Sequence, residues 1–467
     1  MNNTDLVNLW TKKFDIVSKQ IKKISKIPSV ATAFNSNIDA IIKIKGEVLA
    51  KLIIDNNISL EDIEDVKISC FEKETDVILG IVKCFCRGIA EEWITEDIKI
   101  YNWMEKNLGY DKLQMGGQAG IIANALALLG VQKVIAHTNS HPELQAKQFL
   151  NLNNLYAFND KNILEKAFDI SKNSDTPLIH WIIEFDIDDS FSVYGKTFKC
   201  PKSNRFIATY DPLNMNLVMN EGFVKYLDKN SVDYLILSGF HPLLEKCNGV
   251  KLIDNAVKTI KKWKKNNPEM ITHLEIASTQ DKVIRKAIIE KISPLADSIG
   301  LNERETIDLL EILGQDTLSQ TIEKETNSCN LFKAILFLKN KLKCKRIQLH
   351  MFGLYLTIQD KDFVFTPEQN LKGMMTASVV SSSKAFLGEL TTKDDTTKTL
   401  GTDVSERGIC ELTNLSNLIN NPQLLQKGYC EYDNFYVSAI PTILIKKPKT
   451  LVGMGDTISS VSLLAGR

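Results

Sequence analysis

Two glycines and an aspartate near the carboxyl end of the chain have the spacing of an anion-binding turn. Gly453 and Gly455 stand just before a helical pattern over 458–465, and Asp456 follows them directly. Backbone amides at such a turn point at an anion, and the helix that follows adds a partial positive charge. An aspartate at the start of that helix can take a proton from an attacking hydroxyl group during phosphoryl transfer. The alternative is an ordinary turn in which Asp456 caps the helix.

Two further pairs of polar residues have the types and spacing of a divalent-cation site. Asn302 and Glu305 follow the apolar stretch 295–299, and oxygen ligands from one turn suit Mg²⁺, which keeps water and phosphate as its other ligands. The same spacing is also typical of a helix capping box. His273 and Glu275 alternate within a predicted strand and therefore share one face of it. A buried carboxylate there needs a metal-bound water or, as the alternative, a partner on a neighbouring strand.

A third group of residues suits a polyhydroxylated ligand. Asn37 and Asp39 stand at alternate positions after a predicted strand, where their side chains can hydrogen-bond a polyol or form a plain turn. Gly116 and Gly117 precede a helical pattern that begins at Ile121. Paired glycines let a ligand approach the backbone amides, although tight helix packing explains them equally well.

The elements that must position these residues alternate between strand and helix. Strands are predicted at 30–34, 134–137, 234–238, 271–277, 347–358 and 442–445, and helices at 14–26, 255–265, 282–290 and 331–342. The alternation over 230–360 favours a mainly parallel sheet covered by helices. Two stretches interrupt it: 60–115 is charged and helix-like, and 180–210 has short strands around a polar loop. Together they predict a smaller, lid-like domain.

Composition narrows the class of protein. The chain has 467 residues, which allows two or three domains or one large domain with an inserted one. Lys and Arg number 57 and Asp and Glu 57, so a broad nucleic-acid-binding face is not expected. The start of the chain is unlike a signal peptide, and the longest apolar stretch, 120–131, is too short for a membrane span. Nine scattered cysteines predict reduced thiols and not a zinc site, so we expect a cytoplasmic protein.

Seven segments in a fixed order, spread over about 430 residues, carry a resemblance to a known family. They are 34–40, 115–120, 204–207, 273–275, 300–305, 346–355 and 452–459. The chain resembles the ADP-dependent sugar kinases, the archaeal ADP-dependent glucokinases and phosphofructokinases of the ribokinase-like superfamily. The resemblance implies an α/β fold with a large nucleotide-binding domain (1–30, 120–178 and 212–467). It also implies a smaller α+β lid that binds sugar (about 31–119 and 179–211), formed by insertions.

The resemblance also implies roles for individual residues. Asp456 matches the catalytic base, Gly453 and Gly455 the anion hole, and Arg205 an arginine that reaches from the lid to the nucleotide phosphates. The predicted ligands of Mg²⁺ or another divalent cation are Glu275, Asn302, Glu305 and Asp456, with His273 completing the H-x-E motif. The predicted sugar contacts are Asn37, Asp39, Gly116 and Gly117. The rim of the adenine pocket is predicted to contain His350, Met351, Phe352, Val437 and Ile440.

The sugar is less sharply indicated than the phosphoryl donor. Glu92, or else Glu91, aligns with a glutamate of family members that accept glucose, although an exposed helical glutamate pair explains it too. Lys196, Lys199 and Lys202 offer positive charge for a sugar phosphate, whereas the acidic loop 185–189 argues against exclusive use of fructose 6-phosphate.

We therefore predict transfer of the β-phosphoryl group of ADP to the 1-hydroxyl of fructose 6-phosphate, giving fructose 1,6-bisphosphate and AMP, and also to the 6-hydroxyl of glucose. An ADP-dependent glucokinase alone and a non-catalytic nucleotide sensor are the alternatives. The expected partners are ADP and a sugar or sugar phosphate, with no nucleic acid and no membrane. The expected assembly is a monomer or a small homo-oligomer.

Overall fold

The computed structural model describes residues 2–279 and 281–467, which form two main sheets, each with its own apolar core, and a separate two-stranded hairpin. The large sheet has eleven strands, in the order β17-β18-β16-β15-β14-β13-β12-β1-β5-β6-β7. The strands from β15 to β6 all run parallel, and antiparallel strands extend the sheet at both sides. The predicted α/β class with a mainly parallel sheet is therefore confirmed.

The parallel strands are buried on both faces, as in β12 (Tyr234–Leu237), where all four residues are apolar and buried. The other parallel strands are β1 (Val30–Ala33), β5 (Val134–Ala136), β6 (Leu155–Phe158), β13 (Ile271–Glu275), β14 (Ser298–Leu301) and β15 (Arg346–Met351). The antiparallel additions are β7 (Leu164–Lys166), β16 (Leu354–Asp360), β17 (Tyr429–Tyr432) and β18 (Phe435–Pro441).

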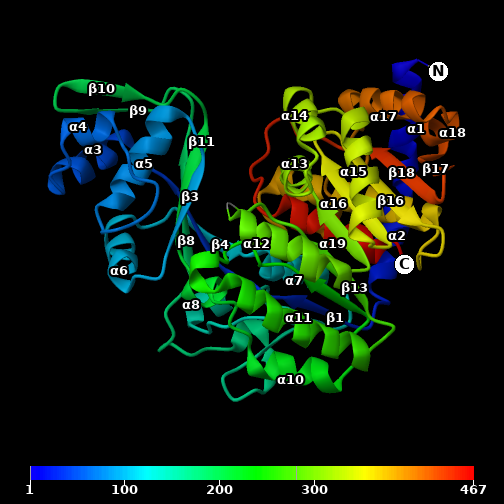
Figure 1. Ribbon diagram of the computed structural model, residues 1–467, viewed down its shortest axis with the longest axis horizontal. Helices are drawn as coiled ribbons and strands as arrows, with labels where there is room; N and C mark the ends of the chain where they lie inside the picture. Colours follow the sequence, from blue (N-terminus) through cyan, green and yellow to red (C-terminus); the bar gives the residue numbers. More distant parts are fainter. Residues whose placement is uncertain (1, 280) are drawn as a thin grey trace.

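Helices cover both faces of the large sheet (Figure 1). The strands β5 and β6 are added beside β1 on one side, whereas β13, β14 and β15 are added beside β12 on the other. Because crossover connections are right-handed, reversing the direction of strand addition moves the connecting helices to the opposite face. On one face lie α2 (Val17–Ile24), α7 (Gln118–Leu128), α16 (Pro367–Leu387) and α19 (Met454–Ala465). On the other lie α10 (Glu221–Lys229), α11 (Gly249–Asn266), α12 (Lys282–Ala287), α13 (Glu303–Ile312) and α15 (Ser328–Leu342). The remaining helices of this domain are α1 (Asn3–Lys13), α8 (Glu143–Ala146), α9 (Pro212–Met215), α14 (Asp316–Lys324), α17 (Glu406–Ile419) and α18 (Pro422–Lys427).

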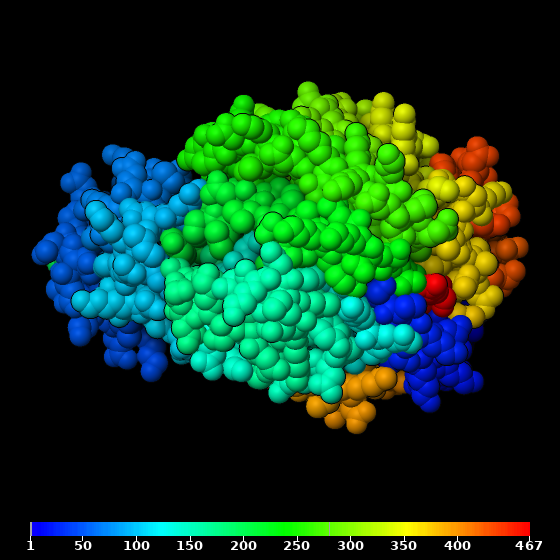
Figure 2. Space-filling view, turned by 90° about the horizontal axis from the view of Figure 1, so that it is seen from below, coloured from blue at the N-terminus to red at the C-terminus, as the bar shows by residue number. Residues whose placement is uncertain are grey.

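The smaller domain projects from one end of the molecule, where Figure 2 shows it in blue. Its five-stranded sheet has the order β3-β11-β8-β2-β4 and mixes parallel and antiparallel pairs. The strands are β2 (Asn37–Lys43), β3 (Glu91–Thr95), β4 (Lys112–Gly116), β8 (Ile179–Phe185) and β11 (Asn204–Tyr210). A hairpin, β9 (Ser190–Val193) and β10 (Lys196–Lys199), and four helices accompany it: α3 (Gly46–Asp55), α4 (Leu60–Glu64), α5 (Asp76–Arg87) and α6 (Ile98–Asn107).

One face of this small sheet is apolar and the other is polar. Trp93, Trp181 and Phe206 are buried in the domain's own core. Because side chains alternate along a strand, their sequence neighbours Glu92, His180 and Arg205 point to the opposite face. That polar face is the one that can serve a ligand.

Several predicted boundaries are corrected by the structure. The lid boundary at residue 31 falls inside β1, which belongs to the large sheet. The helix-like stretch 60–115 contains two strands, β3 and β4, so Glu91 and Glu92 are not helical. The predicted strand 347–358 is a hairpin that turns at Gly353, where φ is +97°.

The predicted strand at 442–445 is wrong, because the strand β18 ends at Pro441. The backbone of Ile443 donates to the Ser378 hydroxyl of α16 and not to a neighbouring strand. The predicted apolar stretch 295–299 lies partly before β14, which begins at Ser298. Within residues 2–279 and 281–467, no helix is both long and apolar enough to cross a bilayer.

Candidate active site

Helix α19 begins at the predicted glycine turn, and Asp456 lies in its first turn. Gly453 caps the helix with φ at +63°, and the first amides of a helix have no intrahelical acceptor. Gly455 is required for close packing, because a Cβ atom there would lie 2.7 Å from His350 Nε2. The turn therefore presents free amides and the positive end of a helix dipole beside a carboxylate, which is the predicted arrangement.

Asp456 is buried and held by a single side-chain hydrogen bond. Gln118 Nε2, at the start of α7, donates to Asp456 Oδ1 over 3.0 Å. Burial raises the pKa of Asp456 above its ordinary value. A carboxylate with a raised pKa is a better proton acceptor, so this environment suits a general base. The sequence reasoning missed Gln118, although it stands next to the predicted Gly116 and Gly117.

Three buried carboxyl groups from three elements gather around this helix start. Glu275 lies at the end of β13, and Glu305 lies in the first turn of α13. Burial raises the pKa of Glu305 to about 8, and Asp456 adds to the rise. Burial, with Asp456 and Glu305 nearby, also raises the pKa of Glu275 well above its ordinary value. Like charges thus repel one another here, which a bound cation would relieve.

Asn302 and Glu305 form the capping box that was the alternative interpretation of their spacing. Asn302 Oδ1 accepts from the Glu305 amide over 3.0 Å, and Glu305 Oε2 accepts from the Asn302 amide over 2.8 Å. His273 is buried between Ser298 Oγ, 3.0 Å from its Nδ1, and Glu275 Oε2, 3.3 Å from its Nε2. These contacts orient Glu275 and use one oxygen of Glu305.

The predicted metal ligands lie near one another without forming a closed cage. In the described part of the chain, no group of three His, Cys, Asp or Glu residues is close enough to hold a metal ion by itself. The donors are nevertheless hard oxygens that repel one another. Such a set fits Mg²⁺, which dehydrates reluctantly and takes most of its ligands from water and phosphate.

The predicted sugar contacts lie at the end of the polar face of the small sheet. Asn37 Nδ2 donates to Asp39 Oδ1 over 3.0 Å, and both residues are buried. Gly116 lies opposite Asn37 in β4, where a Cβ atom would come within 2.1 Å of Asp39 Oδ1. Burial raises the pKa of Asp39 to about 6. The glycine therefore makes room for a buried carboxylate, and His180 and Asn37 offset only part of the effect of burial on its pKa.

Three polar residues next to Asp39 escaped the sequence reasoning. His180 stands beside Asp39 in the register of β8 and β2 and shares an ion pair of 3.0 Å with Asp211. Thr209 donates to Glu92 Oε1 over 2.7 Å, and that oxygen lies 4.0 Å from His180 Nδ1. The missed signal was strand alternation, which places His180 and Thr209 on the same face as Glu92. Asp211 follows the end of β11, where alternation gives no signal.

Arg205 lies on the same polar face but is exposed, and it lines two cavities. One, of about 530 Å³, also has Glu91, Glu92 and Trp93 in its wall. The other, of about 360 Å³, lies between the small sheet and residues 448–452, the loop that leads to Gly453. Arg205 thus occupies the cleft between the domains, on the side opposite the glycine turn.

The residues predicted for the adenine pocket differ in how close they lie to the glycine turn and in how exposed they are. His350 is buried beside Gly455, its Nδ1 has no hydrogen-bond partner in the described structure, and burial lowers its pKa to about 4. Phe352 is exposed, whereas Met351 is buried. Val437 and Ile440 are fully buried in the core of the large sheet, and their contact with a nucleotide stays a prediction.

Comparison with known proteins gives a consistent result over the whole chain. An ADP-specific phosphofructokinase of Methanosarcina acetivorans is 30% identical over 453 residues, covering 93% of this chain and 92% of that protein. An ADP-dependent glucose/glucosamine kinase of Pyrococcus abyssi is 30% identical over 468 residues, covering 98% of both.

Solved structures agree with these relatives. The last common ancestor of ADP-dependent phosphofructokinases from Methanosarcinales superposes with a TM-score of 0.85 at 29% identity, covering 100% of this chain and 99% of the other. An ADP-dependent kinase in complex with fructose 6-phosphate and ADPβS gives a TM-score of 0.83 at 29% identity, covering 98% and 97%. The conserved region described as ADP-specific phosphofructokinase/glucokinase matches residues 28–465. With nearly the whole chain matched, and with Glu275 of the H-x-E strand beside the glycine turn and Asp456 at the start of α19, this chain belongs to the ADP-specific phosphofructokinase/glucokinase family.

Proposed function

We propose that this protein transfers the β-phosphoryl group of ADP to the 1-hydroxyl of fructose 6-phosphate and also to the 6-hydroxyl of glucose. The observation that carries the proposal is the position of Asp456. It lies at the free amides of α19, four residues after Val452, the last residue of the loop that lines the inter-domain cleft together with the small sheet. Family membership and the relatives of both kinds support the same reaction class.

The reaction follows from this geometry. A sugar hydroxyl held by Asn37 and Asp39 gives its proton to Asp456 as its oxygen forms a bond to the β-phosphorus. The bond from that phosphorus to the bridging oxygen of ADP breaks, and AMP leaves with the electron pair. The amides at Gly453 and Gly455 hold the phosphoryl oxygens. Little covalent chemistry is asked of the protein, so positioning and exclusion of water dominate.

We propose that Mg²⁺ or another divalent cation joins ADP in this site, near Glu275, Glu305 and Asp456. When bound, the cation neutralises charge on the phosphates. The three carboxyl groups hold it largely through water, because Glu305 is engaged in its capping box with Asn302. Arg205, on the facing sheet, adds positive charge when the domains close.

The two sugars make different demands on the polar face. Glu92 accepts from Thr209 and lies near His180, so it can hydrogen-bond a hydroxyl of glucose. For the 6-phosphate, the cations that line the cleft are Lys112, Arg205 and Lys449. The lysines of the β9–β10 hairpin region serve less well, since Lys196 pairs with Glu64 over 2.5 Å. Lys112 likewise pairs with Glu389 at 3.2 Å, so we propose that Lys449, with Arg205, attracts the phosphate of the larger substrate.

One assay tests the reaction. The protein is incubated with ADP, Mg²⁺ and either fructose 6-phosphate or glucose, and AMP and the phosphorylated sugar are measured together. We expect AMP in equal amount to the sugar product with both sugars, and no comparable turnover when ATP replaces ADP. Turnover with glucose alone would show a glucokinase. Tight ADP binding without any AMP release would refute the proposal in favour of a nucleotide sensor.

A further inference from the structure

A lysine that the site description has not yet used lies at the glycine turn. Lys384 extends from the last turn of α16, which packs along α19. Its Nζ donates to the Gly453 carbonyl over 3.4 Å, and a Cβ atom on Gly453 would lie 3.0 Å from that nitrogen. The ammonium group therefore sits against the turn whose amides face the cleft.

This ammonium group has no counter-ion in contact. Within residues 2–279 and 281–467, no carboxylate lies within 4.0 Å of Lys384, whereas the buried lysines Lys83 and Lys339 pair with Glu91 at 3.0 Å and Asp360 at 2.6 Å. Lys384 is half-buried, and even partial removal of an ammonium group from water is costly when no carboxylate pairs with it. An unpaired charge of this kind is typical of functional sites, where it binds an oppositely charged ligand.

Charged residues of both domains act electrostatically on Lys384. Asp456 and Asp39 both act on it electrostatically, as do Glu389 and Lys112 from the surrounding loop and strand. Burial lowers the pKa of Lys384 to about 8, and Asp456 and Asp39 oppose this change. Lys384, on the large domain, therefore lies within electrostatic reach of both the proposed base and the proposed sugar contact.

We propose that Lys384 is a catalytic residue that contacts the phosphoryl group as it passes from ADP to the sugar. The inference rests on the proposed function. It assigns one positive charge at the anion hole to Lys384 on the large domain, and Arg205 on the smaller domain adds a second charge from the facing side. The phosphoryl group in flight spreads negative charge over its oxygens, and a fixed ammonium group stabilises that charge more than it stabilises bound ADP.

A purely structural role is the competing explanation, because the bond to Gly453 also anchors the turn. The two explanations differ in what the ligand-bound states require. A structural anchor matters for folding and for ADP binding alike, whereas a contact to the transferring group matters only for turnover and for mimics of that group. The conservative replacement by arginine keeps the charge and separates the two further.

The test compares Lys384→Met, Lys384→Arg and the control Lys372→Met. Lys372 lies three turns earlier on α16 and pairs with Glu368 at its surface. For Lys384→Met we expect kcat to fall about 100-fold or more. The KM values for ADP and sugar and the midpoint of thermal unfolding stay close to wild type. We expect Lys384→Arg to recover part of kcat and Lys372→Met to match the wild type.

Binding of AMP with aluminium fluoride and sugar, a mimic of the phosphoryl group in flight, gives the second readout. We expect Lys384→Met to lose this binding while it keeps ADP binding. Turnover within threefold of wild type, or a loss of ADP binding and thermal stability that parallels the loss of kcat, would overturn the inference. Wild-type AMP release in the same series reports separately on the proposed function.

Discussion

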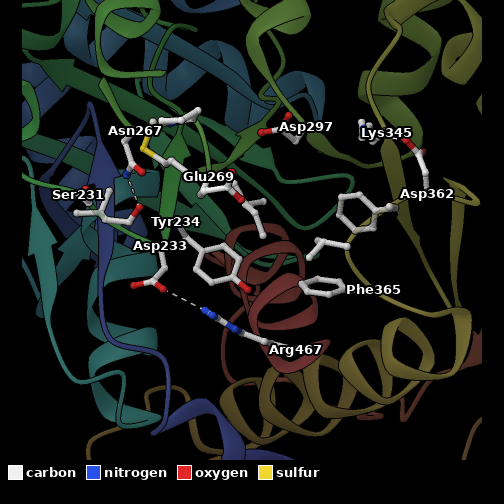
Figure 3. A pocket seen from close by; sticks show the side chains of 16 residues that line it. Ser231, Asp233, Tyr234, Asn267, Glu269, Asp297, Lys345, Asp362, Phe365 and Arg467 are labelled. Atoms are coloured by element: carbon white, nitrogen blue, oxygen red, sulfur yellow. Dashed lines mark hydrogen bonds and ion pairs between the residues drawn. The ribbon is translucent and has the colours of Figure 1, made fainter. Parts of the chain in front are cut away.

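Charged residues are arranged differently at the two ends of the parallel strands, which are called here the amino edge and the carboxyl edge of the large sheet. The amino edge has the larger cavity, about 700 Å³, formed around the starts of β12 and β13 and the residue Arg467 (Figure 3). Its carboxylates are mostly neutralised: Asp233 pairs with Arg467 at 3.2 Å, Asp297 with Lys264 at 2.9 Å and Asp362 with Lys345 at 2.9 Å.

At the carboxyl edge the cavities are smaller, and buried or half-buried ionisable groups have neutral hydrogen-bond partners instead of ion-pair partners. Glu275, Glu305 and Asp456 all have raised pKa values, and Lys384 has a lowered one. Buried charges that repel one another are costly for folding and useful for binding charged ligands. The comparison shows that buried charges without ion-pair partners, and not the larger cavity, distinguish the edge that holds the proposed active site.

The largest effect is expected from Asp456→Asn. Without a proton acceptor at the helix start, we expect kcat to fall by about 10²- to 10⁴-fold while ADP binding is largely kept. The matched change at the amino edge is Asp362→Asn, which removes an exposed carboxylate and should leave kcat at the wild-type value. Both are measured by AMP release. Equal activity of the two variants would break the comparison between the edges.

Next in size is the response of the carboxyl edge to divalent cations. Chelation of Mg²⁺ with EDTA is expected to abolish turnover, and its readdition to restore it. Glu275→Gln weakens the field that holds the cation, so the Mg²⁺ concentration for half-maximal turnover should rise about 10- to 100-fold. Titration of Mg²⁺ at saturating ADP and sugar measures it. An unchanged titration would remove Glu275 from the cation site.

The cost of unpaired charge can be measured directly at Asp39. Its pKa rises from 3.8 to about 6 on folding, so the protonated form is favoured in the folded state, and this contribution is lost as the pH rises through about 6. Asp39→Asn should therefore increase the free energy of unfolding by about 1–3 kcal/mol at pH 8 and much less at pH 4. Denaturant unfolding at both pH values tests this. We expect sugar affinity to fall in the same variant. A more stable variant that binds sugar less tightly would show that Asp39 lowers the stability of the fold and contributes to sugar binding.

A smaller effect is expected at neighbouring residues on opposite faces of β3. Glu92→Gln should raise the KM for glucose about tenfold, because a charged acceptor of hydroxyl groups is lost. Glu91 faces the helices instead, where it pairs with Lys83 and accepts from the Trp93 indole over 2.8 Å. Glu91→Gln should therefore lower stability and leave the KM for glucose alone. If Glu91→Gln shifts KM and Glu92→Gln does not, the assignment of the two faces is wrong.

The sequence predicted the elements of the large sheet better than those of the smaller domain. Continuous apolar runs such as β12 are recognisable because both faces of a parallel strand are buried. By contrast β3, with the sequence Glu-Glu-Trp-Ile-Thr, lies at a sheet edge and begins with two adjacent glutamates, so no alternation of polar and apolar residues marks it as a strand. The strand β18 was misplaced because the β-branched run after Pro441 bonds to a helix side chain.

The residues of the candidate site also differ in whether a local sequence pattern predicts them. Gly453, Gly455 and Asp456 could be predicted because a glycine turn before a helix is a local pattern. His180, Asp211 and Lys384 could not, because they come from separate elements and meet only through tertiary structure. No spacing in the sequence relates Lys384 to Gly453, 69 residues later.

The smallest effect is expected from Arg467→Ala, and it tests the amino edge by itself. Arg467 and Asp233 are both accessible to solvent, and Asp233 keeps its bonds from the amide and hydroxyl groups of Ser29 when the arginine is removed. Because solvent screens such a pair, the free energy of unfolding should fall by only about 0.2–1 kcal/mol. Turnover should be unchanged, since the proposed active site lies at the other ends of the same strands. A loss of kcat in Arg467→Ala without loss of stability would mean that the two edges are coupled through the sheet, and balanced charge would then no longer mark an edge as inert.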